Sequence, residues 1–468
     1  MFKRNLKILL QKISYILLSD VLVRILGFLT FAYIARISDH NIFGILSIGI
    51  SVLNYTAILA SPGLHILGIK YISQKLFNDK LLLTKISNIR FLISIFVIFI
   101  LSLFIFFSTF STDILFSVMI YSLSLIPLAF QVEWFLQAKE NTDHINKGRI
   151  LNALIFFILI FFNYKNSTEW YIVPISFFIA NVIQTIYLQI VSNKLIDNNI
   201  LNSLNSIELI KNSLPLGYSS IATQAVLHLP IVILAFLSPI KEVSLFSASL
   251  KLLFFILAFD RIIYLVLFPF ISKIANNKNK LQYFLNPLLN WLLVLAGMLS
   301  FVLFINSEFI LQLVYGDSFI LASSYFDILL IFFVATLFNS IVGYALISLG
   351  EIKLFSKIIT MFSLLILIIY PISIYYFGTI GAAITLSIGE IIIVSTLYYY
   401  LNTKIQLNVS YFKILSLIYF SLIVINLNSH LYIINSLIVL CIFIIGSLSS
   451  KIIKVSDIHV FKEISITK

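Results

Sequence analysis

Residues 13–35 read ISYILLSDVLVRILGFLTFAYIA, and this stretch decides what kind of protein the chain is. Nearly every position is apolar, and such a run is long enough to cross about 30 Å of hydrocarbon as an α-helix. Asp20 and Arg24 are the exceptions, and a bilayer makes such charges costly. The stretch therefore predicts a transmembrane helix that carries an acid and a base near its middle.

The rest of the chain has the same apolar character. Hydrophobic residues make up 60% of it and charged residues 11%, and the mean hydropathy is +1.07. A soluble globular protein would be nearer half apolar and a quarter charged. We therefore predict an all-α polytopic membrane protein with about 14 (12–14) transmembrane helices. The expected spans are 13–35, 42–64, 91–110, 114–137, 149–163, 171–191, 215–238, 243–270, 283–305, 322–347, 356–376, 380–401, 412–427 and 430–448.

The basic residues are distributed unevenly between the two sides of the membrane. When the N-terminus is placed in the cytoplasm, the inside segments hold 25 of the 31 Lys and Arg residues, and the outside loops hold only Arg36, Lys165 and Lys241. An excess of basic residues in cytoplasmic loops is typical of membrane proteins. The net charge of +12 therefore needs no nucleic-acid partner, and both termini are expected in the cytoplasm. No cleavable signal is evident, so we expect the first span to remain.

The chain divides at a polar, Asn-rich segment near residues 192–214. We expect an N-terminal six-helix lobe over 1–191, a cytoplasmic linker over 192–214 and a C-terminal six-helix lobe over 215–401. Residues 402–468 are expected to form two additional helices and a basic cytoplasmic tail. The second lobe echoes the first at a constant offset of 200, since Ala35, Ser38 and Ser47 recur as Ala235, Ser238 and Ser247. Such parallel repeats occur in transporters, which handle substrate between the halves.

Asp20 and Arg24 lie four residues apart in the first span, so they share one face of a helix. The carboxylate lowers the cost of carrying Arg24 into the bilayer. Two interpretations stay open. The pair is either purely structural, or it faces a cavity in which Arg24 can meet an anion.

The eighth span carries Lys251, Asp260 and Arg261. On a straight helix Lys251 and Arg261 are about 80° apart, whereas Asp260 lies opposite Lys251. One broad face can therefore hold both cations, and Asp260 is not expected to neutralise Lys251. The alternative for both cations is that their long apolar stems carry the charge to the nearest interface.

Glu390 lies near the middle of the twelfth span, where it either pairs with a cation or titrates as a coupling site. Gln224 and His228 share a face of the seventh span. Glu133 lies near a span end, where an interfacial position is expected. Other amides, Gln184 and Asn339 among them, either line a polar cavity or join helices.

No catalytic pattern stands out. The sequence has no phosphate-binding loop, no HExxH motif and no Cys/His cluster with metal spacing. The single cysteine, Cys441, allows no internal disulfide. We therefore expect a carrier rather than an enzyme, with no metal or cofactor.

Several motifs, in their order and spacing over about residues 1–400, resemble one family. They are Arg24 with Gly27-Phe28-Leu29, Ala35-Arg36, Phe43-Gly44, Pro62-Gly63-Leu64 with Lys70-Tyr71-Ile72, Phe246-Ser247-Ala248 with Lys251, Pro269-Phe270-Ile271-Ser272, Tyr315-Gly316, Gly343, Gly350-Glu351-Ile352-Lys353 and Gly378-Thr379-Ile380-Gly381-Ala382-Ala383. This pattern is similar to lipid-linked oligosaccharide flippases of the multidrug/oligosaccharidyl-lipid/polysaccharide (MOP) exporter superfamily. The family often has an acidic residue before the glycine that corresponds to Gly63. Here Ser61 and Pro62 stand instead, so a role of that acid does not transfer.

The resemblance implies a MATE-like fold with two pseudo-symmetric six-helix lobes around a central cavity. It implies export of an undecaprenyl-diphosphate-linked glycan, such as an O-antigen repeat unit for lipopolysaccharide, to the outer leaflet of a bacterial inner membrane. The related lipid II flippases bind diphosphate with cavity arginines on the first and eighth spans, so Arg24, Lys251 and Arg261 are the implied ligands. Asp20, Asp260, Glu390, His228 and Gln224 would be supporting or coupling residues. Other proteins of polysaccharide assembly are implied as further partners.

Two alternatives stay open beside the flippase. A multidrug exporter of organic cations would be expected to have a carboxylate-dominated cavity, whereas the membrane charges here are mainly cationic. A membrane polysaccharide polymerase or glycosyltransferase would need a sizeable outer loop, and the longest outer segment, near 306–321, is short.

Overall fold

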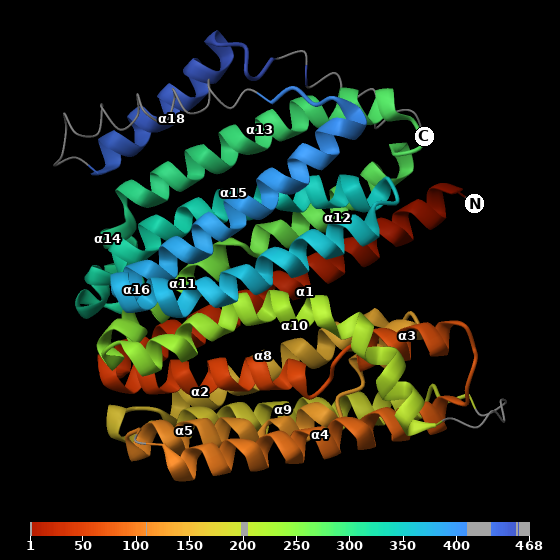
Figure 1. Cartoon of the computed structure of the whole chain (residues 1–468), viewed down its shortest axis with the longest axis vertical. Helices are drawn as coiled ribbons and strands as arrows, with labels where there is room; N and C mark the ends of the chain where they lie inside the picture. Colours follow the sequence, from red (N-terminus) through yellow and green to blue (C-terminus); the bar gives the residue numbers. More distant parts are fainter. Residues whose placement is uncertain (1, 109, 198–204, 410–431, 455–456, 458–468) are drawn as a thin grey trace. The chain divides into compact units, whose positions relative to one another are not determined.

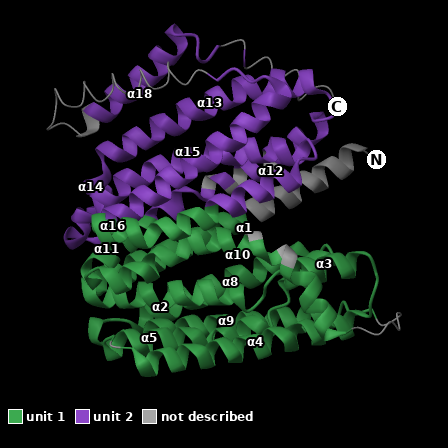
Figure 2. Cartoon of the chain, in the orientation of Figure 1, with its two compact units in different colours: residues 1–251, 363–379 green, residues 252–362, 380–468 purple. Residues whose placement is uncertain are grey.

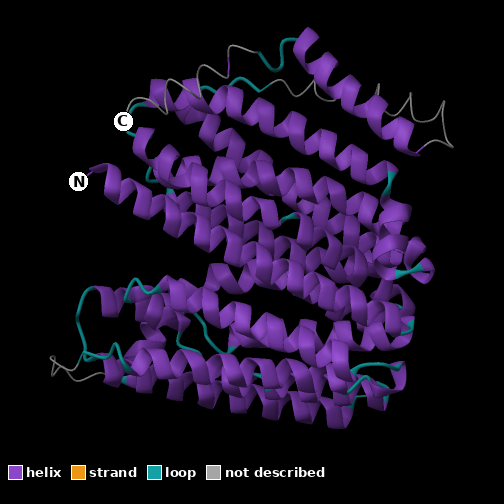
Figure 3. Cartoon of the chain, turned by 180° about the vertical axis from the view of Figure 1, so that it is seen from behind, coloured by secondary structure: helices purple, strands orange, loops and turns teal. Residues whose placement is uncertain are grey.

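The structure of the chain, a computed structural model, describes residues 2–108, 110–197, 205–409, 432–454 and 457. All regular secondary structure among these residues is helical (Figure 1, Figure 3). The all-α class predicted from the apolar runs is therefore confirmed for the described part of the chain.

The chain forms two compact units (Figure 2). Unit 1 comprises residues 1–251 and 363–379, and unit 2 comprises residues 252–362 and 380–468. Arg24 and Lys251 both belong to unit 1, whereas Asp260, Arg261 and Glu390 belong to unit 2. The division into two six-helix lobes with a linker over 192–214 stays a prediction.

Unit 1 holds the first helices of the chain. They are α1 (Phe2–Ile37), α2 (His40–Leu59), α3 (Leu64–Ser73), α4 (Asp79–Phe107), α5 (Thr112–Leu123), α6 (Leu125–Ala129), α7 (Glu133–Ala138), α8 (Thr142–Asn163), the 3₁₀ turn η1 (Ser167–Glu169), α9 (Ile172–Asn193), α10 (Ser206–Leu237) and the first part of α11 (Ile240–Ile256).

Unit 2 holds the later helices. They are the end of α11, α12 (Ala258–Ile274), α13 (Lys278–Ile305), α14 (Ser307–Tyr315), the 3₁₀ turn η2 (Asp317–Ala322), α15 (Ser323–Ser348), most of α16 (Ile352–Ile405) and α18 (Tyr432–Ser449). Residues 363–379 of α16 belong to unit 1. In unit 2, Phe443 of α18 is buried in one hydrophobic cluster with Val294 of α13.

Ten helices in the described part are long and apolar enough to cross a membrane. The number 14 is not confirmed, and each difference has a cause. The predicted spans 356–376 and 380–401 lie in the single long α16, and 243–270 is divided between α11 and α12. The span predicted at 412–427 lies outside the described residues, and 430–448 corresponds to α18, whose described apolar stretch is short.

Two residues account for the divisions within these helices. Gly378 in α16 has φ 58° and ψ −143°, a conformation that glycine adopts readily and other residues rarely adopt. It separates the predicted spans 356–376 and 380–401. Leu257 has φ −62° and ψ −7° and lies between α11 and α12. The helix predicted to run from Lys251 to Arg261 is therefore divided at Leu257, so the angles expected for one straight helix do not apply.

Large apolar side chains are exposed along the membrane helices. In α4, Phe106 and Phe107 are 80% and 79% exposed, a pattern that suits contact with lipid rather than with water. The same helix buries Leu82 and Ile86 in a cluster with Trp134 and Phe135 of α7. Trp134, the neighbour of Glu133, is thus part of the core of unit 1.

Helix α2 closely approaches the start of α11 within unit 1. His40 Nδ1 lies 3.3 Å from Ser244 Oγ. The offset of 200 relates position 40 to 240 and position 44 to 244, so the equivalent contact joins Ile240 and Gly44. A Cβ atom at Gly44 would lie 2.7 Å from the Ile240 carbonyl oxygen. The echo seen in the sequence thus corresponds to a contact made twice, and a glycine at position 44 is what permits it.

Replacing Gly44 with alanine should destabilise the protein. The new methyl group would meet Ile240 Cγ2 at 2.5 Å, and overpacking of this kind costs about 1–3 kcal/mol. Gly27→Ala is the matched control, because a Cβ atom there meets nothing within 4 Å and alanine favours a helix. Thermal unfolding in detergent should show a lower Tm for Gly44→Ala and an equal or higher Tm for Gly27→Ala. Equal values for both variants would contradict the close approach.

Candidate functional site

The first charged pair lies on α1. Arg24 Nε donates a hydrogen bond to Asp20 Oδ2 at 3.0 Å, so the ion pair expected from the four-residue spacing is present. The side chain of Arg24 is 38% exposed. Its two terminal nitrogens form no hydrogen bond with another described residue. The guanidinium is therefore compensated on one edge and accessible on the other.

Lys251 on α11 has a different environment. Its Nζ donates a hydrogen bond to Ser47 Oγ of α2 at 2.9 Å. The ammonium also lies 4.7 Å from the ring centroids of both Phe31 and Phe43, which is within the range of cation–π attraction. One hydroxyl and two ring faces thus surround a group with three N–H donors. No described carboxylate lies within ion-pair distance of Lys251, so its charge lacks a counter-ion there.

Asp260 and Arg261 follow on α12. The side chain of Arg261 is not among those that the structure describes, so its predicted place in the site stays a prediction. Asp260 lies close enough to Glu390 of α16 for the two carboxylates to repel each other. Glu390 Oε1 accepts a hydrogen bond from Asn339 Nδ2 of α15 at 2.6 Å. Unit 2 therefore brings two predicted coupling residues together and adds an amide that holds one of them.

Gln224 and His228 are half-buried on α10. Neither side chain forms a hydrogen bond or ion pair with another described residue. Their assignment as supporting residues therefore gains no specific contact from the structure.

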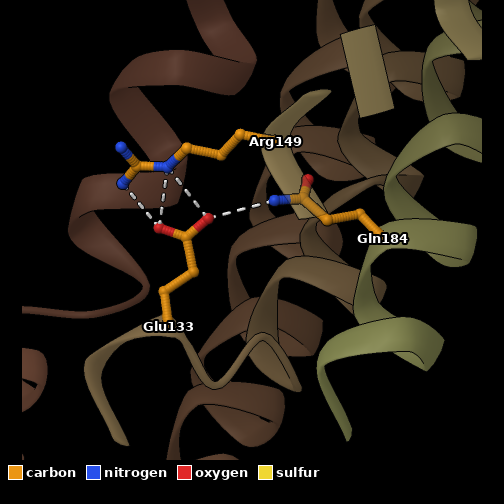
Figure 4. A network of polar contacts seen from close by, with 3 residues as sticks. All are labelled: Glu133, Arg149 and Gln184. Carbon is orange, nitrogen blue, oxygen red and sulfur yellow. Dashed lines mark hydrogen bonds and ion pairs between the residues drawn. The ribbon is translucent and has the colours of Figure 1, made fainter. Parts of the chain in front are cut away.

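A network centred on Glu133 connects three helices of unit 1 (Figure 4). Arg149 of α8 contacts both oxygens of the Glu133 carboxylate, with Nη2–Oε2 at 2.7 Å and Nε–Oε1 and Nε–Oε2 at 3.2 Å. Gln184 of α9 donates to Glu133 Oε1 at 3.0 Å. Glu133 is therefore part of a network that joins α7, α8 and α9, a role that its expected interfacial position did not indicate.

Arg149 is the first residue of the predicted span 149–163, but α8 begins at Thr142, so Arg149 lies about two turns inside the helix. A signal was available in the sequence, because the polar residues before Arg149 contain no proline and can extend a helix.

The break between helices α6 and α7, just before Glu133, is stabilised by neighbouring side chains. Arg90 of α4 donates to the carbonyls of Leu128 and Gln131 at 2.6 and 2.9 Å. Gln189 of α9 donates to the Phe130 carbonyl at 2.6 Å. Carbonyls released where a helix ends need such donors, above all within a membrane. These contacts fix the start of α7 and with it the position of Glu133.

Metal ligation gains no support from the described residues, among which no group of three or more His, Cys, Asp or Glu side chains is suitably placed. Cys441, on α18, is exposed.

Comparison with known proteins places this arrangement in context. The profile of a family described as polysaccharide biosynthesis protein matches residues 9–275. A sequence search of curated proteins found no match. Among solved structures, the lipid II flippase MurJ in an inward closed conformation is 18% identical with a TM-score of 0.69, and the match covers 92% of this chain and 97% of the flippase.

Two further structures share the fold. An inward-facing multidrug resistance MATE family transporter of the MOP superfamily is 12% identical with a TM-score of 0.62, covering 82% of this chain and 94% of its own. A MOP superfamily transporter from Pyrococcus furiosus is 13% identical with a TM-score of 0.54, covering 84% and 95%. At such identities the likeness concerns the fold, and it confirms the predicted MATE-like class.

The contact between Asn339 and Glu390 can be tested by a double-mutant cycle of Asn339→Leu, Glu390→Met and the combined variant. Asn339→Leu should lower the stability, because a carboxylate in a membrane helix loses its donor, at a cost of about 1–3 kcal/mol. Asn339→Leu with Glu390→Met removes both partners and should recover most of that loss. Unfolding temperatures of the purified variants give the comparison. Equal losses in the single and double variants would show that the hydrogen bond does not stabilise this part of unit 2.

Proposed function

Because the chain belongs to the polysaccharide biosynthesis protein family, we propose that it is a flippase for a lipid-linked oligosaccharide. The substrate would be an undecaprenyl-diphosphate-linked repeat unit of a surface polysaccharide, such as O-antigen. Transport would run from the cytoplasmic to the outer leaflet of a bacterial inner membrane, with both termini in the cytoplasm. The protein would act as a transporter and not as an enzyme.

The environment of Lys251 carries this proposal. A cation within a membrane protein is costly unless it is paired, and Lys251 has a hydroxyl and two aromatic rings but no described counter-ion. A diphosphate would supply the missing negative charge. Arg24 on α1, whose side chain is partly exposed, adds a second cation in the same unit. Arg261 stays a predicted contributor.

The proposed mechanism is alternating access. Arg24, Lys251 and Arg261 bind the diphosphate in the course of transport, the glycan occupies a polar cavity and the prenyl tail stays in lipid. Two negative charges that move outward through an inside-negative potential gain about 5 kcal/mol per 100 mV. The membrane potential therefore favours the export direction. Asp260 and Glu390, whose carboxylates interact in unit 2, are the candidates for a coupling site.

A multidrug exporter of organic cations is the main alternative, because a MATE family transporter has a similar fold. The absence of a described carboxylate beside Lys251 speaks against a site that selects cations. A polymerase would be distinguished by its loss phenotype, since single repeat units would still be exported. Loss of a flippase instead leaves the lipid-linked unit on the cytoplasmic side.

Arg24→Gln and Lys251→Gln should each abolish export, because each removes a positive charge proposed to bind the diphosphate. The measurement is the fraction of lipid-linked oligosaccharide accessible at the outer face of spheroplasts. It is made in cells that lack the wild-type protein and express each variant at equal membrane levels.

Lys404→Gln is the control, because Lys404 forms an exposed ion pair with Glu351 and its loss should leave export unchanged. Full export by the Arg24 and Lys251 variants would refute the diphosphate role. Ethidium efflux that depends on the protein, with no defect in glycan export, would instead support the cation exporter.

A further inference from the structure

Arg149 has the geometry of a second anion-binding guanidinium beside Arg24. We propose that Arg149 and Arg24 together bind the diphosphate of the lipid-linked substrate, and that Glu133 and Gln184 are positioning residues for Arg149. This inference rests on the proposed function and extends it, since it adds a diphosphate ligand that is not among the site residues predicted from the sequence.

The packing of α1 on α8 brings the two arginines to the same level. The rings of Phe31 and Phe156 lie 6.3 Å apart. The Tyr33 hydroxyl donates to the Phe161 carbonyl at 3.3 Å, so the chain direction of the two helices is the same. Arg24 and Arg149 each precede their phenylalanine by seven residues, which is about two turns and returns to nearly the same face. The two guanidinium groups therefore project from matching positions on neighbouring parallel helices.

Asp20 connects the two arginines. Its carboxylate accepts the hydrogen bond from Arg24 and also attracts the guanidinium of Arg149 electrostatically. Two like charges on adjacent helices would otherwise repel each other. In the absence of substrate, Asp20 and Glu133 balance the two arginines, so the pair can persist within the membrane without a bound anion.

Each guanidinium keeps an unused edge. Arg149 bonds Glu133 through Nε and Nη2, its Nη1 forms no hydrogen bond with another described residue, and its side chain is 45% exposed. Arg24 uses only Nε. Guanidinium groups bind phosphate through paired N–H donors. A diphosphate has two phosphate groups, so two adjacent guanidinium groups suit it better than they suit a monophosphate.

Glu133 and Gln184 hold Arg149 in one orientation. Glu133 contacts two of its nitrogens, and Gln184 in turn fixes the carboxylate (Figure 4). The remaining edge of the guanidinium is thereby given a defined direction. A purely structural ion pair would join α7 and α8 equally well, but it would have no effect on which lipid phosphate the protein prefers. That preference is the property to measure.

The experiment uses the full-length protein in lipid nanodiscs and compares the Kd for undecaprenyl diphosphate with that for undecaprenyl phosphate. The wild type should prefer the diphosphate. Arg149→Gln should weaken diphosphate binding by roughly tenfold or more, the effect of losing a charge-assisted contact, and should change monophosphate binding little. Arg149→Lys keeps a charge beside Glu133 but loses the paired N–H donors of the guanidinium, so its preference for the diphosphate should be intermediate.

Arg36→Gln is the matched control, because Arg36 is an exposed arginine at the end of the same α1 and should leave both constants unchanged. Glu133→Gln should reduce the preference less than Arg149→Gln does, because it loosens Arg149 without removing it. Unfolding temperatures identify any variant that fails to fold. Arg149→Lys retains the ion pair and serves as the test if Arg149→Gln is unstable.

The outcomes separate this inference from the proposed function. Suppose that Arg149→Gln or Arg149→Lys prefers the diphosphate over the monophosphate as strongly as the wild type does, while Arg24→Gln loses this preference. That result would overturn the role of Arg149 and leave the flippase proposal standing. A wild-type protein that binds neither lipid phosphate would overturn both. Loss of preference in Arg149→Gln with an intact fold supports the two-arginine site.

Discussion

The cost of placing charge in hydrocarbon governs how this protein arranges its polar residues. An uncompensated charge at the bilayer centre costs at least about 3 kcal/mol on the insertion scale. Asp20 compensates Arg24 within one helix, and Glu133 compensates Arg149 between helices. Lys251 is treated differently, because a hydroxyl and two aromatic rings take the place of an acid. Among these cations Lys251 therefore has the most to gain from an incoming anion.

Hydropathy predicted most helices because the membrane requires a long apolar run wherever the chain crosses it. It placed the break at Gly378 correctly, between the predicted spans 356–376 and 380–401. It did not predict where α8 begins, nor the division of α11 from α12 at Leu257, which involves no glycine or proline. The first two turns of α8 are polar and were taken for a loop, since hydropathy reports contact with hydrocarbon and not helix formation.

The candidate site was predictable only where its contacts are local. Asp20 and Arg24 are four residues apart, so their pairing follows from helix geometry. Ser47 is 204 residues from Lys251, and Gln184 is 51 residues from Glu133. Such partners are brought together by helix packing, which no periodicity in one chain segment records. The family resemblance seen in the motifs is confirmed by the profile match, but that match names no residue of the site.

The ring of Phe31 on α1 makes two contacts. It packs against the ring of Phe156, and the ammonium of Lys251 lies over it. Phe31 lies two turns, or about 10 Å, beyond Arg24 along the helix. The ring of Phe31 thus belongs both to the packing of α1 on α8 and to the surroundings of Lys251. A shift of α1 against α8 would therefore also move the ring face that the ammonium of Lys251 meets.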